Sequence, residues 1–417
     1  MPTTVLRDRR RLTGAAVTNM ELFFDLVYVF AVTQLSHHLL AQLTLRGAIE
    51  TLVLFLAVWW AWNYTAWATN WIDPDHPAVR GLLVVLMLIS LVMAVKIPRA
   101  FGEEGLGFAT AYVALQAVRS AFMVVAFRGQ RMGRNYAQLL AWTAIAGIAW
   151  VAGAFVPGDG RLLVWIGALV LDYGAPLHGF ALPGLGRTPM RAWTLAGSHL
   201  AERNQQVVLI ALGESILATG ATFGALPARA PIVTAFVVGF VGTVSLWWLY
   251  FVRHAEEGAQ AIARAPDPAR LGRAGYAYAH GIMVGGVIVV AVAIDLTIAH
   301  PTGPMSSAAA AVILGGPAIY LAGNALFNYA LTGRTPWSRL TGVSVLAFLV
   351  PLALAAEPLA LSAAATLVTL TLALATGSPR SPEGRGRQAP SGDGRARGTD
   401  APPEPRDDDR RRPPVTP

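Results

Sequence analysis

The sequence contains no cysteine among its 417 residues, and charged side chains are scarce, since Asp, Glu, Lys and Arg make up only 13%. Without a thiol the chain cannot form a disulfide, a thiolate metal site or a cysteine nucleophile. A soluble domain carries roughly twice this proportion of charge. The low charge therefore favours a protein that is embedded in a membrane.

Sequence signatures of several enzyme classes are missing too. There is no phosphate-loop or dinucleotide fingerprint, no His-x3-His or His-Glu-x2-His zinc pattern, and Gly213-Glu214-Ser215 is not a nucleophile elbow. The arginines lie between apolar blocks and form no single basic face, so nucleic acid is not an expected partner. We expect no cofactor and no bound metal, and the sequence does not favour an enzyme, although it leaves that question open.

Hydrophobic residues account for 54% of the chain, and its mean hydropathy is +0.50. Apolar runs of about twenty residues recur, and each is long enough to cross a hydrocarbon layer of about 30 Å as a helix. The sequence thus predicts an all-α, polytopic transmembrane bundle of about twelve spans. We place them at 21–40, 48–68, 80–98, 107–127, 136–156, 161–180, 204–223, 231–252, 276–298, 308–330, 338–356 and 358–377.

The positive charges alternate in number between successive loops. The segments on the side of the N-terminus hold seventeen: Arg7, Arg9, Arg10, Arg11, Arg80, Arg128, Arg131, Arg134, Arg187, Arg191, Arg203, Arg253, Arg264, Arg270, Arg273, Arg334 and Arg339. The opposite loops hold five: Arg46, Lys96, Arg99, Arg161 and Arg229. Positive loops stay in the cytoplasm, so this bias predicts two cytoplasmic termini. Because Arg7 to Arg11 lead directly into a full-length span, we expect an uncleaved anchor.

The chain divides by composition into a cytoplasmic arm (1–20), two six-helix halves (21–180 and 181–377) and a tail (378–417). Trp59-Trp60 and Trp247-Trp248 lie in corresponding spans of the halves, which suggests a parallel duplication about an axis along the membrane normal. The tail is rich in Pro, Gly, Arg and Asp and should be disordered. It is either simply solvated or an arginine-rich arm that touches anionic lipid headgroups.

Two carboxylates open the first predicted span. An ionisable residue at the centre of a span costs about 2.5 to 3.5 kcal/mol and needs a partner or an aqueous cavity. Glu21 and Asp25 are one helical turn apart and share a stripe with Tyr28 and Ser36. They would be tolerated if one is protonated, or if an arginine or a cation lies between them. Alternatively, both cap the start of the helix.

A second polar stripe leads into the predicted span 204–223. Its members are His199, Glu202, Arg203, Gln206, Gly213 and Glu214. Glu214 lies about 16 Å beyond Arg203 along the axis, which is near the bilayer midplane. We expect Arg119 to be its partner there, with Asp172 as a third central charge. Such a group is either a structural clamp or the bottom of a proton or ion path.

Two long motifs resemble a known family. Residues 19–35 read NMELFFDLVYVFAVTQL, and 199–203 (HLAER) are followed by 211–217 (ALGESIL). Both are similar to motifs of the bacterial low temperature requirement A (LtrA) proteins. The predicted helix that contains Arg119 also resembles this family. The family often has Phe after the second motif's arginine, where this chain has Asn204. The resemblance implies a bacterial inner-membrane protein associated with growth or stress at low temperature, but no particular activity.

Three functions remain open. The first is ion- or proton-linked transport in which Glu21, Asp25 and Glu214 face a shared cavity and bind or relay a cation, with the lipid bilayer and an ion or small solute as partners. The second is an enzyme acting on a lipid or lipid-linked substrate through His199, Glu202 and Arg203. The third is a non-catalytic protein of membrane assembly or signalling, in which the charges are structural clamps.

Overall fold

A computed structural model describes residues 5–7, 17–184, 186–188, 193, 195–252, 254–265 and 267–377. In this part of the chain the secondary structure is helical, with isolated bridges and no longer strand. The helices are α1 Asn19–Ala41, α2 Leu45–Ala68, α3 Pro77–Lys96, α4 Gly105–Ala126, α5 Arg131–Ala154, α6 Asp159–Leu177, α7 Gly197–Gly224, α8 Ala230–Phe251, α9 His254–Ala263, α10 Pro268–Leu271, α11 His280–Ala299, α12 Ser307–Thr332, α13 Trp337–Phe348, α14 Val350–Ala353 and α15 Pro358–Gly377. A 3₁₀ turn, Ile97–Arg99, follows α3, and a π-helical segment, Gly272–Ala279, leads from α10 into α11.

Eleven of the described helical segments are long and apolar enough to cross a membrane. They match eleven of the expected spans, so the prediction of an all-α polytopic bundle is confirmed. The expected span 338–356 differs, because it consists of α13 and α14, separated at Leu349. Pro351 explains the interruption: it has no backbone N–H to continue the helix, and its ring clashes with the preceding turn. The expected disordered tail, 378–417, lies outside the described residues.

The two predicted halves have the same order of neighbouring helices. In the first half α1 packs against α2 and α3, α4 against α3 and α5, and α6 against α5 and α2. In the second half α7 packs against α8 and α11, α12 against α11 and α13, and α15 against α13 and α8. This correspondence supports the predicted duplication, which pairs α13 and α14 together with α5. The duplication itself stays a prediction.

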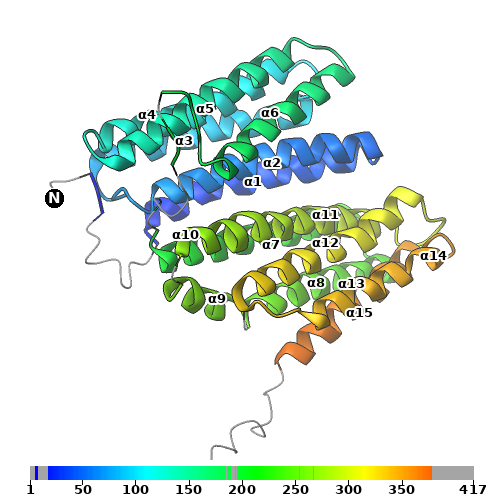
Figure 1. Ribbon diagram of the computed structural model, residues 1–417. Coiled ribbons are helices and arrows are strands. Elements are labelled where there is room, and N and C mark those ends of the chain that lie inside the picture. Colours follow the sequence, from blue (N-terminus) through cyan, green and yellow to red (C-terminus); the bar gives the residue numbers. More distant parts are fainter. Residues whose placement is uncertain are drawn as a thin grey trace, which may run out of the picture. The chain divides into compact units, whose positions relative to one another are not determined.

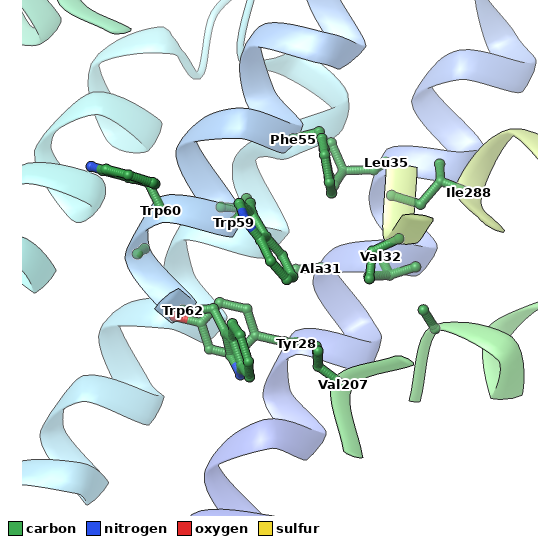
Figure 2. Close-up of a cluster of buried hydrophobic side chains, with 14 of the residues drawn as sticks. Tyr28, Ala31, Val32, Leu35, Phe55, Trp59, Trp60, Trp62, Val207 and Ile288 are labelled. Atoms are coloured by element: carbon green, nitrogen blue, oxygen red, sulfur yellow. The ribbon is translucent and has the colours of Figure 1, made fainter. Parts of the chain in front are cut away.

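Helices α1 and α2 lie between α3–α6 and the helices that follow α7 (Figure 1). Helix α1 contacts both α7 and α11, and α2 contacts the same two helices. The contact between the halves is mainly apolar: Tyr28, Val32 and Leu35 of α1 meet Val207 of α7 and Ile288 of α11 (Figure 2). Helix α1 therefore brings its polar side chains directly to the helices of the second half.

The described part of the N-terminal arm is fixed to the loop after α2. Leu6 forms a bridge with Ile72, and the Arg7 backbone N–H donates to the carbonyl of Trp71 over 3.0 Å. The Arg7 side chain also donates to the Ile72 carbonyl, over 3.1 Å. These contacts position the Arg7 guanidinium at the start of α1.

Candidate functional site

Arg203 of α7 joins the two carboxylates of α1. Its Nη1 lies 3.2 Å from Glu21 Oε1, and its Nη2 lies 2.6 Å from Asp25 Oδ1. Nη1 also donates to Thr69, the residue after α2, and the indole N–H of Trp62 donates to the same Asp25 oxygen over 2.8 Å. An arginine between the carboxylates was one of the three arrangements expected from the sequence, and it is the one observed.

Glu21 is surrounded by donors on every side. Thr18 and Glu21 form a capping box at the start of α1, so the expected capping role is present as well. Arg7 Nη2 lies 2.9 Å from Glu21 Oε2, and His199 Nε2 lies 2.9 Å from Oε1. This side chain is therefore both a helix cap and a member of the contact between the halves.

The hydrogen-bond network assigns the tautomer of His199. The Asn70 side-chain oxygen accepts the backbone N–H of Ala196, so its amide nitrogen faces His199 Nδ1, 3.3 Å away. Nδ1 thus accepts a hydrogen bond, and Nε2 carries the proton that is donated to Glu21. With a neutral His199, the charges of Arg7 and Arg203 balance those of the two carboxylates.

We call this group the α1–α7 clamp; its members are Arg7, Glu21, Asp25, His199 and Arg203. Arg7 is 8% exposed at its side chain, and the other four are fully buried. In a buried network with balanced charges, loss of one partner leaves an uncompensated charge, so such a network favours a fixed contact between the two helices. Glu202 lies beside the clamp and accepts the backbone N–H of Val17 over 3.1 Å.

Glu214 belongs to a second place on α7. Its Oε2 accepts the hydroxyl of Thr33 of α1 over 2.6 Å, and it interacts electrostatically with Asp295 of α11 and with His37. Asp295 in turn accepts the hydroxyl of Thr222, two turns beyond Glu214. Glu214 is 3% exposed, whereas Thr33, Thr222 and Asp295 are half-buried. We call Thr33, Glu214, Thr222 and Asp295 the acidic site.

Apolar packing separates the clamp from the acidic site. On α1, Tyr28 and Val32 are 3% and 6% exposed, and on α7 Val207, Val208 and Ala211 are at most 4% exposed. Figure 2 shows Tyr28, Val32 and Val207 in this layer. The expected single cavity shared by Glu21, Asp25 and Glu214 is therefore wrong: the faces of α1 and α7 do meet, but at two separate places.

Arg119 and Asp172 are also separate from Glu214. Asp172 of α6 accepts the hydroxyl of Tyr112 and the indole N–H of Trp150, each over 2.9 Å. Arg119 of α4 contacts α2 and, among the described residues, makes no ion pair with Glu214 or Asp172. The expected central group of these three charges is not formed, because the helices that carry them face different neighbours.

Sequence reasoning missed two charged members of these sites. Arg7 was read only as a topology signal, and nothing local to it indicated the contact with Glu21. Asp295 carried a usable signal, since it is an ionisable residue inside the expected span 276–298.

The fold and these buried charges define a multi-pass helical membrane protein whose first and seventh helices are joined by an ionic clamp. Residues 16–374 match the family described as bacterial low temperature requirement A protein (LtrA), and the chain belongs to this family. An uncharacterized protein of Rhizobium meliloti (strain 1021) is 37% identical over 330 residues, which cover 78% of this chain and 80% of that protein. No solved structure matches the chain.

Proposed function

We propose that the protein carries out ion- or proton-linked transport across the bacterial inner membrane, with the acidic site as the place where the cation or proton binds. One observation carries the proposal: Glu214 and Asp295 lie on the adjacent membrane-spanning helices α7 and α11 and accept hydrogen bonds from the hydroxyls of Thr33 and Thr222, and among the described residues the basic side chain that interacts with both is the exposed His37. Two carboxylates in a medium of low dielectric do not both stay charged without a partner. A shared proton or a bound cation would remove this conflict.

The clamp has a different part in this proposal. Because its charges are balanced and buried, it binds no ion and instead holds α1 against α7 on one side of the apolar layer. The acidic site lies on the other side of that layer. Transport would then require α1 and α7 to move apart at the clamp, so that the acidic site opens alternately to the two sides.

The topology and the biological setting belong to the same proposal. The distribution of arginines supports cytoplasmic termini, provided that α13 and α14 together complete a crossing. The family description supports a role in growth or stress at low temperature. Among the described residues no observation favours an enzyme acting on lipids, since His199 and Arg203 are enclosed by α1 and α2.

The test is flux of H⁺, Na⁺ and K⁺ in proteoliposomes that contain the purified full chain. Glu214→Gln and Asp295→Asn should each lower the flux at least tenfold, since losing one charge-assisted contact costs about 1.5 to 3 kcal/mol, or roughly ten- to hundredfold in affinity. Glu50→Gln is the matched control: Glu50 is also a buried carboxylate of a spanning helix, but it pairs with Arg46 over 2.8 Å. Absence of flux in the unaltered protein, or unchanged flux in both acidic-site variants, would refute the proposal.

A further inference from the structure

Arg119 is a buried arginine whose guanidinium uses one side of its hydrogen-bonding capacity and leaves the other side unused. Arg119 is 1% exposed, and its Nη1 donates to the Ala61 carbonyl and the Thr65 hydroxyl of α2, each at 3.4 Å. Within the described part of the chain, Nε and Nη2 have no hydrogen-bond partner. These two atoms form the side of the guanidinium that receives a carboxylate or phosphate in a two-point contact. A buried charge left in this way is strongly unfavourable unless another group compensates it.

The guanidinium borders a cavity whose other walls also hold unused donors. The cavity measures about 30 Å³, which is room for two or three water-sized atoms. Its lining residues include Trp60, Asn63, Trp67 and Trp193, whose side-chain nitrogens are buried and have no hydrogen-bond partner among the described residues. Figure 2 shows Trp60 leaving α2 on the side opposite Val32, with its nitrogen pointing away from that core.

The unused groups share one property: they are N–H donors. Two of the nitrogens belong to a cation, and Arg273, also half-buried and lining the cavity, adds a second positive charge. The ring of Tyr64 covers the guanidinium at 5.1 Å, so one face of the cation is already closed and its free edge is directed elsewhere. The complementary ligand is an anionic group that presents two or three acceptor oxygens to these donors.

We propose that this cavity binds a small oxyanion, a carboxylate or phosphate group, on the free edge of Arg119. The group belongs either to a free anion or to the head of an anionic lipid, since both present the same oxygens. The site is distinct from the acidic site: Arg119 is on α4, and the cavity is lined by residues of α2, α4, α5 and α6 together with Phe180, Trp193, Arg273 and Ala277. The inference therefore does not depend on the proposed transport.

The test uses tryptophan fluorescence of the purified full chain in a neutral detergent, because three indoles line the cavity. Sodium phosphate and sodium acetate are the free-anion probes, at constant ionic strength set with chloride. Dihexanoyl phosphatidic acid is the lipid probe, with dihexanoylglycerol as its uncharged counterpart. A saturable change with the salts indicates a free anion, and one with phosphatidic acid alone indicates a lipid head. Either result supports the proposal, and no saturable change with any probe overturns it.

Arg119→Met tests the role of the charge. It removes the guanidinium but keeps an unbranched apolar side chain, so we expect a folded protein whose affinity for the probe is roughly ten- to hundredfold weaker. Arg161→Gln is the matched control, because Arg161 is also a buried arginine of a spanning helix but donates to the carbonyls of Ala100, Gly102 and Ala154. The control should lower the unfolding temperature and leave probe affinity unchanged. Unchanged affinity in Arg119→Met would overturn the proposal.

Trp60→Phe tests the proposed anion site if Arg119→Met does not fold. This substitution keeps a six-membered aromatic ring against Tyr173, with which Trp60 stacks at 3.9 Å between centroids, and removes the five-membered ring of the indole together with its N–H. We expect weaker probe binding, by a factor of about three to ten, from the loss of one neutral hydrogen bond. If the affinity is the same as in the unaltered protein, the indole N–H does not face the anion and the proposed site is wrong.

Discussion

Removing the arginine of the clamp should leave one of its two carboxylates with far fewer partners than the other. In Arg203→Gln, Glu21 keeps its contacts with Arg7, His199 and Thr18. Among the described residues, Asp25 keeps one hydrogen bond, from the indole N–H of Trp62. Breaking a buried ion pair from one side costs about 3 to 5 kcal/mol, because the remaining charge is left uncompensated. The loss in this variant should therefore come mainly from Asp25.

A double-mutant cycle isolates that contribution. Asp25→Asn alone should cost about 1 to 3 kcal/mol, since Arg203 still faces Glu21. In the Arg203→Gln background the same change removes the unpaired charge, so the double variant should be more stable than the sum of the single losses by about 2 kcal/mol. The free energies of unfolding are measured in detergent micelles by denaturant titration, followed by circular dichroism.

The exposed pair of Arg80 and Asp75 is the matched control. Their side chains are 56% and 61% exposed and 2.9 Å apart, so water and salt already screen their attraction. The corresponding cycle, Arg80→Gln with Asp75→Asn, should give a coupling below about 1 kcal/mol. If the coupling at the clamp is no larger than at this surface pair, the description of the clamp as a buried ionic contact is refuted.

Two further predictions concern packing and pH. Gly286→Ala should destabilise the protein by about 1 to 3 kcal/mol, because the added methyl would lie 2.5 Å from the backbone nitrogen of Tyr320 on α12. Gly315→Ala is the control, because nothing lies within 4 Å of the added methyl there. An equal loss of stability in both variants would contradict the reasoning. Outside the spans, a hydrogen bond from Lys96 lowers the pKa of Glu104. The stability from this contact is therefore fully present above the usual pKa of a glutamate, about 4.3, and is lost as the pH falls through the lowered pKa. Denaturant titrations at a series of pH values should show a decline at acid pH that is smaller in Glu104→Gln, and identical profiles would exclude the contact.

The parts of the site that the sequence predicted depend on regular spacing within one helix. At 100° per residue, Glu21 and Asp25 must share a face of α1, and His199 and Arg203 must share a face of α7. Opposite charges on two such faces have few ways to be satisfied inside a membrane. The arginine between the carboxylates was therefore foreseeable, as were eleven of the spans.

The parts that were not predicted depend on which helices are neighbours. A helical wheel gives the direction of Glu214 but does not say which helix lies there, so Arg119 was assigned to it although Thr33 and Asp295 are its neighbours. The contact between Arg7 and His199 joins positions 192 residues apart, and no local pattern encodes it. Pro351 was visible in the sequence, yet the apolar composition of 338–356 outweighed it.

The separation of the clamp residues along the chain also has a consequence for biosynthesis. Arg203 follows Asp25 by 178 residues. At about 5 to 20 residues per second, the ribosome needs roughly 10 to 35 s to reach it. By then six hydrophobic segments have been synthesised, and until then the aspartate of the first one has not met the guanidinium of Arg203. Newly made α1 must therefore hold this carboxyl as the neutral acid or keep it near the headgroups until the second half arrives.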